Sequence, residues 1–145
     1  MIYIDFGKAF DKVDYGILQN KLKKIGINGE VGVWIRKFLS NRQQCVALNG
    51  TTSSEVQIRS GVPQGSVLGP LLFLIHISDL NYIRNNGLDS IMLCWWCSNH
   101  SGNKIWRGHT DATNDLHKMY KWADINNRKF NANKFELLRY GKDRE

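Results

Sequence analysis

The chain has 145 residues, of which 42% are hydrophobic, and its 20 Lys and Arg residues against 13 Asp and Glu give a formal net charge of +7. This length allows one domain with a modest core, and the ordinary apolar content argues against a disordered chain. The basic excess favours a polyanionic partner, while three cysteines form no even disulfide framework and so predict a reducing compartment.

No segment of the sequence is expected to enter a membrane. The N-terminus begins directly with a strand-like pattern and shows no signal peptide. The longest apolar run, from Leu71 to Ile77 with His76 inside it, is far too short to span a bilayer. We therefore expect an intracellular protein, nuclear or cytoplasmic, that is neither secreted nor bound to a membrane.

The first part of the chain predicts a strand, two helices and a hairpin. The expected elements are a strand at residues 1–6, helices at about 15–24 and 30–40, and hairpin arms at 43–48 and 54–58. Asp14 is a good N-cap for the first helix, and Asn49-Gly50 is a strong signal for a tight hairpin turn. Arg42 and Arg59 flank the hairpin, where they either contact phosphate groups or form ordinary solvated surface.

An eleven-residue segment from Ser60 to Pro70 joins the hairpin to an apolar helix expected at about 67–84. It contains three glycines and both prolines of the chain, with Gln64 between the prolines. A stiff glycine-rich turn that opens a helix offers unpaired N–H groups to a phosphate or a sugar. An ordinary connection between a strand and a helix is the alternative, and composition alone leaves both open.

The last part of the chain predicts a strand at 88–93, a helix from Thr110 to about Asn126 and a closing strand at 135–140. Residues 98–108, between the first two, have neither helical nor strand periodicity. Cys94 and Cys97 have the spacing of a redox pair or half a zinc site, but no second pair of this kind follows.

Three stretches resemble reverse transcriptases of non-LTR, LINE-type retrotransposons. The segment from Ser60 to Phe73, SGVPQGSVLGPLLF, is similar to the nucleotide-binding segment of that family. Residues Tyr3 to Asp14, YIDFGKAFDKVD, resemble its first catalytic motif, and Lys121 to Lys134 resemble the region after its second. The resemblance covers most of the chain, and residues 94–109 depart from the family pattern.

The resemblance implies an α/β (α+β) fold, the palm of a right-hand polymerase, in which helices pack on an antiparallel sheet. Residues 1–145 would form a partial reverse transcriptase domain that lacks the thumb, most of the fingers and the endonuclease of the parent protein. The implied reaction is RNA-templated DNA synthesis, in which a primer 3′-hydroxyl attacks a dNTP with the help of two Mg²⁺ ions. The implied partners are an RNA template, a DNA primer and dNTPs.

The resemblance also assigns roles to particular residues. Asp5 would be catalytic as a Mg²⁺ ligand, and Lys134 would act near the pyrophosphate. The implied dNTP contacts are Phe6, Phe10, Ser60, Gly61, Gln64 and Gly65. An aromatic ring at Phe10 would disfavour a ribose 2′-hydroxyl. The ordinary alternatives are a capping role for Asp5, core packing for Phe10 and a surface position for Lys134.

The second catalytic motif of the family, Phe-Ala-Asp-Asp, is missing. The chain has Leu93-Cys94-Trp95-Trp96-Cys97 in its place, without a carboxylate. Asp89 lies six residues before Trp95, roughly 20 Å along an extended strand, and is a poor substitute. With Asp5 alone the two-metal site cannot assemble, so we expect little or no polymerase activity.

A one-base frameshift is one hypothesis for this loss. If Trp95 and Trp96 stand for UGA codons, the shifted frame spells Phe-Ala-Asp-Asp. A true replacement of the carboxylates is the other possibility.

Two functions of other classes stay open beside the family reaction. One is a non-catalytic, basic remnant that binds nucleic acid, and the other is a metal or thiol module at Cys94 and Cys97.

Overall fold

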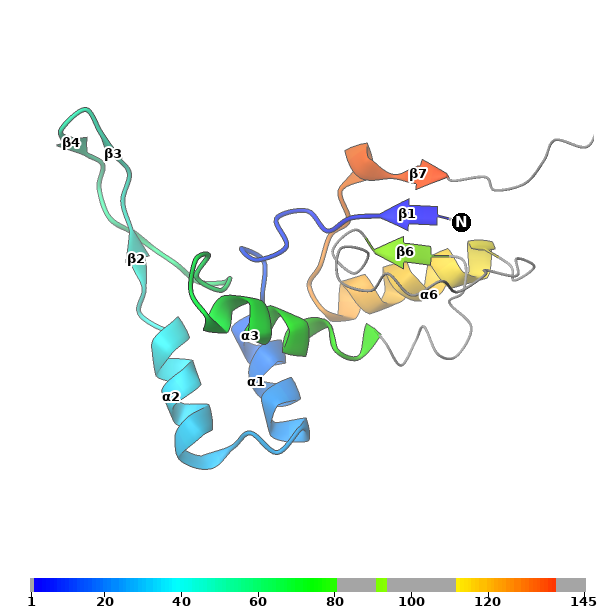
Figure 1. Cartoon of the computed structure of the whole chain (residues 1–145), viewed down its shortest axis with the longest axis horizontal. Helices are drawn as coiled ribbons and strands as arrows, with labels where there is room; N and C mark the ends of the chain where they lie inside the picture. The colour runs from blue at the N-terminus through cyan, green and yellow to red at the C-terminus, as the bar shows by residue number, and fades with distance from the viewer. Residues whose placement is uncertain (1, 81–90, 94–111, 138–145) are drawn as a thin grey trace, which may run out of the picture. The chain divides into compact units, whose positions relative to one another are not determined.

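The structure is a computed structural model that describes residues 2–80, 91–93 and 112–137 of the chain (Figure 1). The chain divides into two compact units. The first unit consists of Met1–Gly7 and Ser78–Glu145, and the second consists of Lys8–Ile77. In the described part of the chain, no helix has the length and apolar content needed to cross a bilayer.

The described residues of the first unit form a three-stranded sheet and one long helix. The strands are β1 (Ile2–Ile4), β6 (Ile91–Leu93) and β7 (Glu136–Leu137), in the order β6-β1-β7. Helix α6 (Ala112–Ile125) contacts β6 and runs beside the sheet (Figure 1). The predicted helix at residues 110–126 is confirmed from residue 112 onward, and residues 110 and 111 lie outside the described part.

The sheet is mixed, so the expectation of an antiparallel sheet is only half right. Strand β7 is antiparallel to β1, with Ile2 opposite Leu137, but β6 is parallel to β1, with Ile4 opposite Leu93. Parallel neighbours need a long crossover connection, and the described part of the chain between β1 and β6 includes three helices. The alternation of residues within short strands does not reveal their direction, which depends on this connection.

Aromatic residues fill the core of the first unit. Phe6 stacks on Phe130 with ring centroids 5.3 Å apart and lies 5.8 Å from the ring of Trp122. Trp122 also donates a hydrogen bond from Nε1 to Asp79 Oδ1 at 2.9 Å. The buried apolar residues in the described part of this unit are Ile4, Phe6, Leu80, Met119, Trp122 and Ala123. Burial of their apolar surface holds the sheet against α6.

Three helices form the body of the second unit. They are α1 (Tyr15–Lys24), α2 (Gly29–Leu39) and α3 (Leu68–Ile77), and α1 contacts the other two. Asp14 caps α1 as predicted, because its Oδ1 accepts a hydrogen bond from Ile17 N at 3.0 Å. The buried apolar residues of this unit are Val13, Leu18, Leu22, Ile35, Leu39, Val62, Leu72, Phe73 and Ile77.

Helix α3 is shorter than predicted. It ends at Ile77, followed by a turn at Ser78 and Asp79, whereas the apolar pattern predicted a helix to about residue 84. Ser and Asp favour turns because their side chains compete for backbone hydrogen bonds. Residues 81–84 lie outside the described part.

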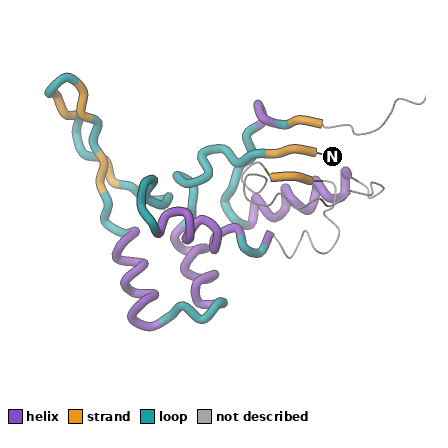
Figure 2. The backbone as a smooth tube through the Cα atoms, in the orientation of Figure 1, coloured by secondary structure: helices purple, strands orange, loops and turns teal. Residues whose placement is uncertain are grey.

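The predicted hairpin of the second unit is confirmed as an exposed arm (Figure 2). Its strands are β2 (Gln43–Gln44), β3 (Ala47–Leu48), β4 (Thr51–Thr52) and β5 (Val56–Gln57), with β2 paired to β5 and β3 paired to β4. Asn49 and Gly50 have φ angles of 50° and 79°. A two-residue hairpin turn of type I′ requires positive φ at both of these positions. The second arm begins at Thr51, three residues earlier than predicted.

Candidate functional site

Asp5 follows strand β1 in the first unit and is held by three contacts. Its Oδ1 accepts a hydrogen bond from Phe6 N at 2.9 Å, and its Oδ2 forms an ion pair with Lys134 Nζ, also at 2.9 Å. Its backbone oxygen accepts a hydrogen bond from Asn131 N at 2.8 Å. The structure therefore brings the two predicted catalytic residues, Asp5 and Lys134, into direct contact.

A short helical turn places Lys134 beside Asp5. This turn, η1 (Ala132–Lys134), follows Asn131, whose side-chain oxygen accepts a hydrogen bond from Asn133 N at 3.1 Å. Lys134 N donates to Asn131 O at 3.0 Å, which closes the turn. Because Asn131 also binds the backbone of Asp5, it fixes the start of the turn and directs the lysine toward the carboxylate.

The described residues do not fit a two-metal centre. Mg²⁺ takes hard oxygen ligands in near-octahedral geometry, and a pair of ions needs several carboxylates around it. Within residues 2–80, 91–93 and 112–137, no group of three or more His, Cys, Asp or Glu residues is placed to hold a metal ion. The Oδ2 of Asp5 is paired with an ammonium group instead. We therefore derive no chemical step through a metal at this site.

Phe6 lies in the core of the first unit. Its side chain is 6% exposed, and the guanidinium of Arg128 lies 5.0 Å from the centre of its ring. Burial lowers the pKa of Arg128 from its ordinary value to about 10, because a charged group is poorly solvated there. These contacts give Phe6 a packing role, and its contact with a dNTP stays a prediction.

In the second unit, the start of the glycine-rich segment lies against the second half of the first motif. Gly61 N donates to Val13 O at 2.8 Å and Val62 N donates to Phe10 O at 2.9 Å. Ser60 Oγ donates to the backbone oxygen of Asp11 at 2.8 Å. The two segments that the resemblance assigns to dNTP binding in this unit are thus joined by hydrogen bonds.

Two side chains extend this contact. Gln64 Nε2 donates a hydrogen bond to Asp11 Oδ1 at 3.2 Å, and both side chains are exposed. Phe10 is half-buried and stacks on Phe73 of α3, with ring centroids 4.9 Å apart. Phe10 therefore packs against the core, as one alternative had it, and keeps part of its surface accessible. The structure brings Phe10, Ser60, Gly61 and Gln64 together in one region.

Two glycines of the segment are required by close backbone approach. Gly61 has a φ of +90°, and a Cβ atom there would lie 2.7 Å from Asp11 O. A Cβ at Gly69 would collide with the backbone oxygen of Pro63. Gly65 has a φ of +79°, but nothing lies within 4 Å of the position that a Cβ atom would take, so only its backbone conformation requires glycine.

The segment ends at the start of α3, where Ser66 supplies a local cap. Gly69 N donates to Ser66 Oγ at 2.9 Å, and Ser66 Oγ in turn donates to Pro63 O at 2.8 Å. One of the helix-start N–H groups expected to meet a phosphate or sugar therefore has an internal partner. Gln64 and Gly65 are exposed, as are Val67 and Pro70 at the start of the helix.

The internal hydrogen bonds of Arg42 were not predicted from the sequence. We expected a phosphate contact or a solvated side chain, but Arg42 is half-buried and bonded internally. Its Nε donates to Leu39 O at 3.1 Å, and its Nη2 donates to Tyr15 Oη at 2.8 Å and to Gly61 O at 2.6 Å. Tyr15 and Gly61 lie 27 and 19 residues away, so no local pattern could reveal these two contacts.

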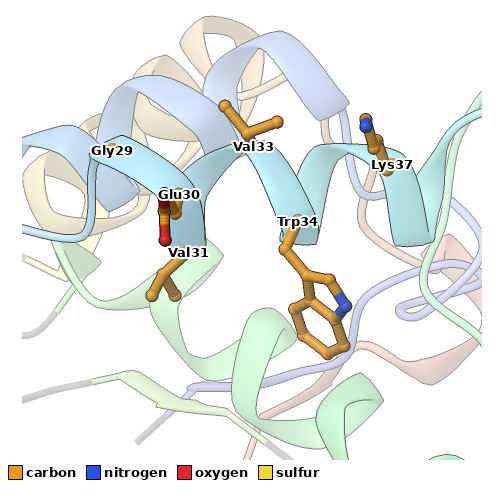
Figure 3. Close-up of a pocket in the computed structure, with 6 residues that line it drawn as sticks. All are labelled: Gly29, Glu30, Val31, Val33, Trp34 and Lys37. Carbon is orange, nitrogen blue, oxygen red and sulfur yellow. The ribbon is translucent and has the colours of Figure 1, made fainter.

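A pocket of about 720 Å³ lies along α2, and none of the residues predicted for the site lines it (Figure 3). Its lining residues are Gly29, Glu30, Val31, Val33, Trp34 and Lys37. Val31 and Trp34 project to the same side of the helix and are more than half exposed. The lining is mostly apolar and comes from a single helix, which does not provide convergent polar groups for catalysis.

The comparison with protein families identifies the class to which the chain belongs. The family model described as reverse transcriptase (RNA-dependent DNA polymerase) matches residues 1–96, which is more than half of the chain. The chain therefore belongs to the reverse transcriptase family. The match includes both the Asp5 motif and the glycine-rich segment, and it ends within the stretch where the second catalytic motif was expected.

Individual relatives come from retrotransposons that lack long terminal repeats. The chain is 39% identical over 79 residues to the probable RNA-directed DNA polymerase from transposon BS of Drosophila melanogaster. It is 37% identical over 78 residues to the RNA-directed DNA polymerase from mobile element jockey of the same organism. It is 29% identical over 80 residues to the retrovirus-related Pol polyprotein from type-1 retrotransposable element R2 of Popillia japonica.

These matches cover little of each relative. They span 54% of this chain but 9% of the transposon BS protein and 8% of the jockey protein, and 55% of this chain but 13% of the R2 protein. The resemblance to non-LTR retrotransposon reverse transcriptases is confirmed, and the chain corresponds to a small part of the relatives it matches.

Proposed function

We propose that the chain is part of the palm of a retrotransposon reverse transcriptase and that this copy has little or no polymerase activity of its own. The reaction of the intact protein would be RNA-templated synthesis of DNA from dNTPs. The chain would retain the nucleotide-binding segment and lack the carboxylates that complete the catalytic centre.

The register of the mixed sheet supports a palm. Ile4 lies opposite Leu93 in parallel strands, so β1 and β6 end at the same edge of the sheet. Asp5 directly follows one of these ends, and the family's second catalytic motif is expected to follow the other. A sheet of this order would bring carboxylates from both motifs together in a complete enzyme.

One observation carries the proposed loss of activity: among residues 2–80, 91–93 and 112–137, Asp5 is paired with Lys134 and belongs to no group of three or more acidic or other metal-binding residues. Nucleotidyl transfer depends on positioning and on neutralising negative charge, and a pair of metal ions does both. A cluster with one carboxylate and one ammonium group cannot hold two divalent ions side by side.

A primer-extension assay tests this loss. The purified chain is incubated with an RNA template, a DNA primer, dNTPs and Mg²⁺, beside the Asp5→Ala variant as a matched control. We expect no extension above the level of the control. Synthesis that requires Mg²⁺ and disappears in Asp5→Ala would overturn the proposed inactivity.

We also infer that the second unit still binds nucleotides through the exposed residues of the glycine-rich segment. Gln64 supports this inference. A carboxylate can only accept hydrogen bonds, so the amide nitrogen of Gln64 is the atom that faces Asp11. The amide oxygen, Oε1, can then accept a hydrogen bond from a ligand hydroxyl. Gln64→Ala should weaken dNTP binding about tenfold, as expected for a lost polar contact in a binding site.

A titration of the chain with a dNTP measures this effect. Gln57→Ala is the matched control, because Gln57 is another exposed glutamine and lies in β5 of the hairpin. Equal weakening in both variants would contradict a specific role for Gln64, and absence of binding by the unmodified chain would overturn the inference itself.

A non-catalytic nucleic-acid binder is the second candidate. The net charge of +7 favours it, together with exposed basic residues of the second unit at Lys23, Lys24, Arg36 and Lys37. Phosphate contacts release counterions, so binding to single-stranded RNA should weaken steeply between about 50 and 200 mM salt. Salt-independent binding would contradict this candidate.

Cys94 and Cys97 lie outside the described residues. A metal or thiol role for them stays a prediction, which a measurement of the zinc content of the purified chain would test.

A further inference from the structure

The peptide group between Gly61 and Val62 is held at both of its polar atoms. Its carbonyl oxygen, Gly61 O, accepts a hydrogen bond from Arg42 Nη2 at 2.6 Å. Its N–H group, Val62 N, donates to Phe10 O at 2.9 Å. The orientation of this peptide plane is thus fixed from two sides, by a backbone oxygen on one and by the side chain of Arg42 on the other.

We propose that Arg42 is a positioning residue for nucleotide binding, which fixes this peptide and through it the exposed residues Gln64 and Gly65. The inference rests on the proposed nucleotide binding by the glycine-rich segment. Arg42 does not itself contact the ligand in this arrangement, because its guanidinium is directed at protein oxygens.

The backbone at this point needs an external support. Gly61 has a φ of +90° and lacks a side chain to restrict it, so rotation of the Gly61–Val62 peptide has a low intrinsic cost. Pro63 restricts the residue before it to extended conformations, but it does not fix the peptide plane one residue earlier. Any rotation there changes the direction in which the chain enters Pro63 and Gln64.

An arginine suits this role better than a lysine. Its planar fork carries donors at fixed angles, and Arg42 uses two nitrogens for three acceptors on separate parts of the unit. Nε binds Leu39 O at the end of α2, where a helix has carbonyl groups without helical partners. Tyr15 Oη, at the start of α1, orients Nη2 toward Gly61. A lysine has a single nitrogen and no fork.

Three variants of the full 145-residue chain separate positioning from simple support of the fold. Arg42→Lys removes the fork and keeps the charge, whereas Tyr15→Phe removes one oxygen that orients it. Arg59→Lys is the matched control, because Arg59 is exposed and flanks the other arm of the hairpin. Each variant is measured by amide hydrogen exchange observed by NMR and by titration with a dNTP.

In Arg42→Lys, exchange of the Val62 amide should accelerate about tenfold or more, while the amides of α1 keep their protection. The affinity for a dNTP should fall about tenfold, as expected for one lost charge-assisted hydrogen bond. Tyr15→Phe should show the same two changes to a smaller degree. Arg59→Lys should show neither. A purely structural role would accelerate exchange throughout the unit, and that result would overturn the proposal.

The nucleotide titration distinguishes this inference from the function on which it rests. If the unmodified chain binds dNTPs and Arg42→Lys binds them equally well, the role of Arg42 is overturned and the proposed binding stands. If the unmodified chain binds no dNTP, the proposed binding is overturned and the role of Arg42 with it. The exchange rate of the Val62 amide tests in either case whether Arg42 fixes the Gly61–Val62 peptide, because this measurement requires no ligand.

Discussion

At the scale of single residues, Lys134 is the counter-charge that Asp5 has in this structure. The lysine side chain is 57% exposed and that of the aspartate is 18% exposed, so water and salt screen their attraction. A pair of this kind holds its partners in place without adding much stability. Asp5 is therefore a candidate to exchange Lys134 for another cation.

A double-mutant cycle measures the strength of this pair. Asp5→Asn, Lys134→Met and the double variant should give a coupling energy of about 0.5 kcal/mol, the value typical of exposed ion pairs. The measurement is the free energy of unfolding in urea at low salt. A coupling of several kcal/mol would show that the ion pair is a structural feature of the first unit, with Asp5 committed to Lys134.

Arg128 predicts a dependence of stability on pH. Burial lowers its pKa to about 10, whereas the unfolded chain keeps the higher, ordinary value of an arginine. Between these values the unfolded state binds more protons at this site, so the stability contribution of Arg128 rises with pH. Below pH 10 both states are protonated, and the cost of burying the charge is constant and at its largest.

Arg128→Met should remove this contribution. The difference in free energy of unfolding between the unmodified chain and the variant should change in favour of the unmodified chain as the pH rises above about 10. Comparison with the variant cancels the titration of tyrosines and lysines. Lys129→Met, at the exposed neighbouring position, is the control and should run parallel to the unmodified chain.

At the scale of elements, the glycine-rich segment depends on two different properties of glycine. Gly61 combines a positive φ with backbone atoms of Asp11 within 3 Å of any added Cβ. Gly65 has a positive φ and open space around it. The first position is closed to any side chain, while the second tolerates one at the cost of strain in the backbone.

Alanine substitutions at these positions should therefore differ in effect. Gly65→Ala should cost about 1 kcal/mol of stability, the usual penalty for a left-handed conformation without glycine. Gly61→Ala should cost about 3 kcal/mol or more, because strain and a backbone collision add. Urea unfolding monitored by tryptophan fluorescence measures both. Equal losses would mean that the contact with Asp11 relaxes freely.

The elements that sequence could predict are those with local causes. The cap at Asp14 and the turn at Asn49-Gly50 arise within a few residues of chain, and both are confirmed. The end of α3 at Ile77 was missed, because the apolar pattern continues past the Ser78-Asp79 turn. The parallel pairing of β6 was missed because strand direction depends on a connection of more than eighty residues.

The site shows the same division. The proximity of Asp5 and Lys134 follows from family motifs, although nothing in the local sequence links residues 129 positions apart. Arg42 belongs to no motif, and its three partners are two backbone oxygens and a hydroxyl. Backbone oxygens leave no mark in a sequence, so a side chain bonded to them is read as surface.

At the scale of the whole molecule, the register of the sheet shows where the missing motif would stand, and restoring it requires substitutions at four positions. Leu93 lies opposite Ile4 in the parallel pair, so both strands end at the same edge of the sheet. The family motif would be restored by Leu93→Phe, Cys94→Ala, Trp95→Asp and Trp96→Asp. This change also corresponds to the reading frame that a one-base shift would give.

The fourfold variant should regain a site for divalent metal. Three carboxylates, those of Asp5 and of the two introduced aspartates, would then share one edge of the sheet, and the number of charged ligands sets the affinity for a hard cation. We expect Mn²⁺, used as a probe for Mg²⁺, to bind about tenfold or more tightly than to the parent chain. Electron paramagnetic resonance of free Mn²⁺ measures this directly.

Two further variants decide what such binding means. Addition of Asp5→Ala to the fourfold variant should abolish the gain, because it removes the ligand at the end of β1. A version with Asn in place of both introduced Asp residues controls for the loss of two tryptophans and should bind no better than the parent. If the fourfold variant gains no affinity, or gains it without Asp5, the two strands do not bring a shared metal site together, and the proposed palm fails with it.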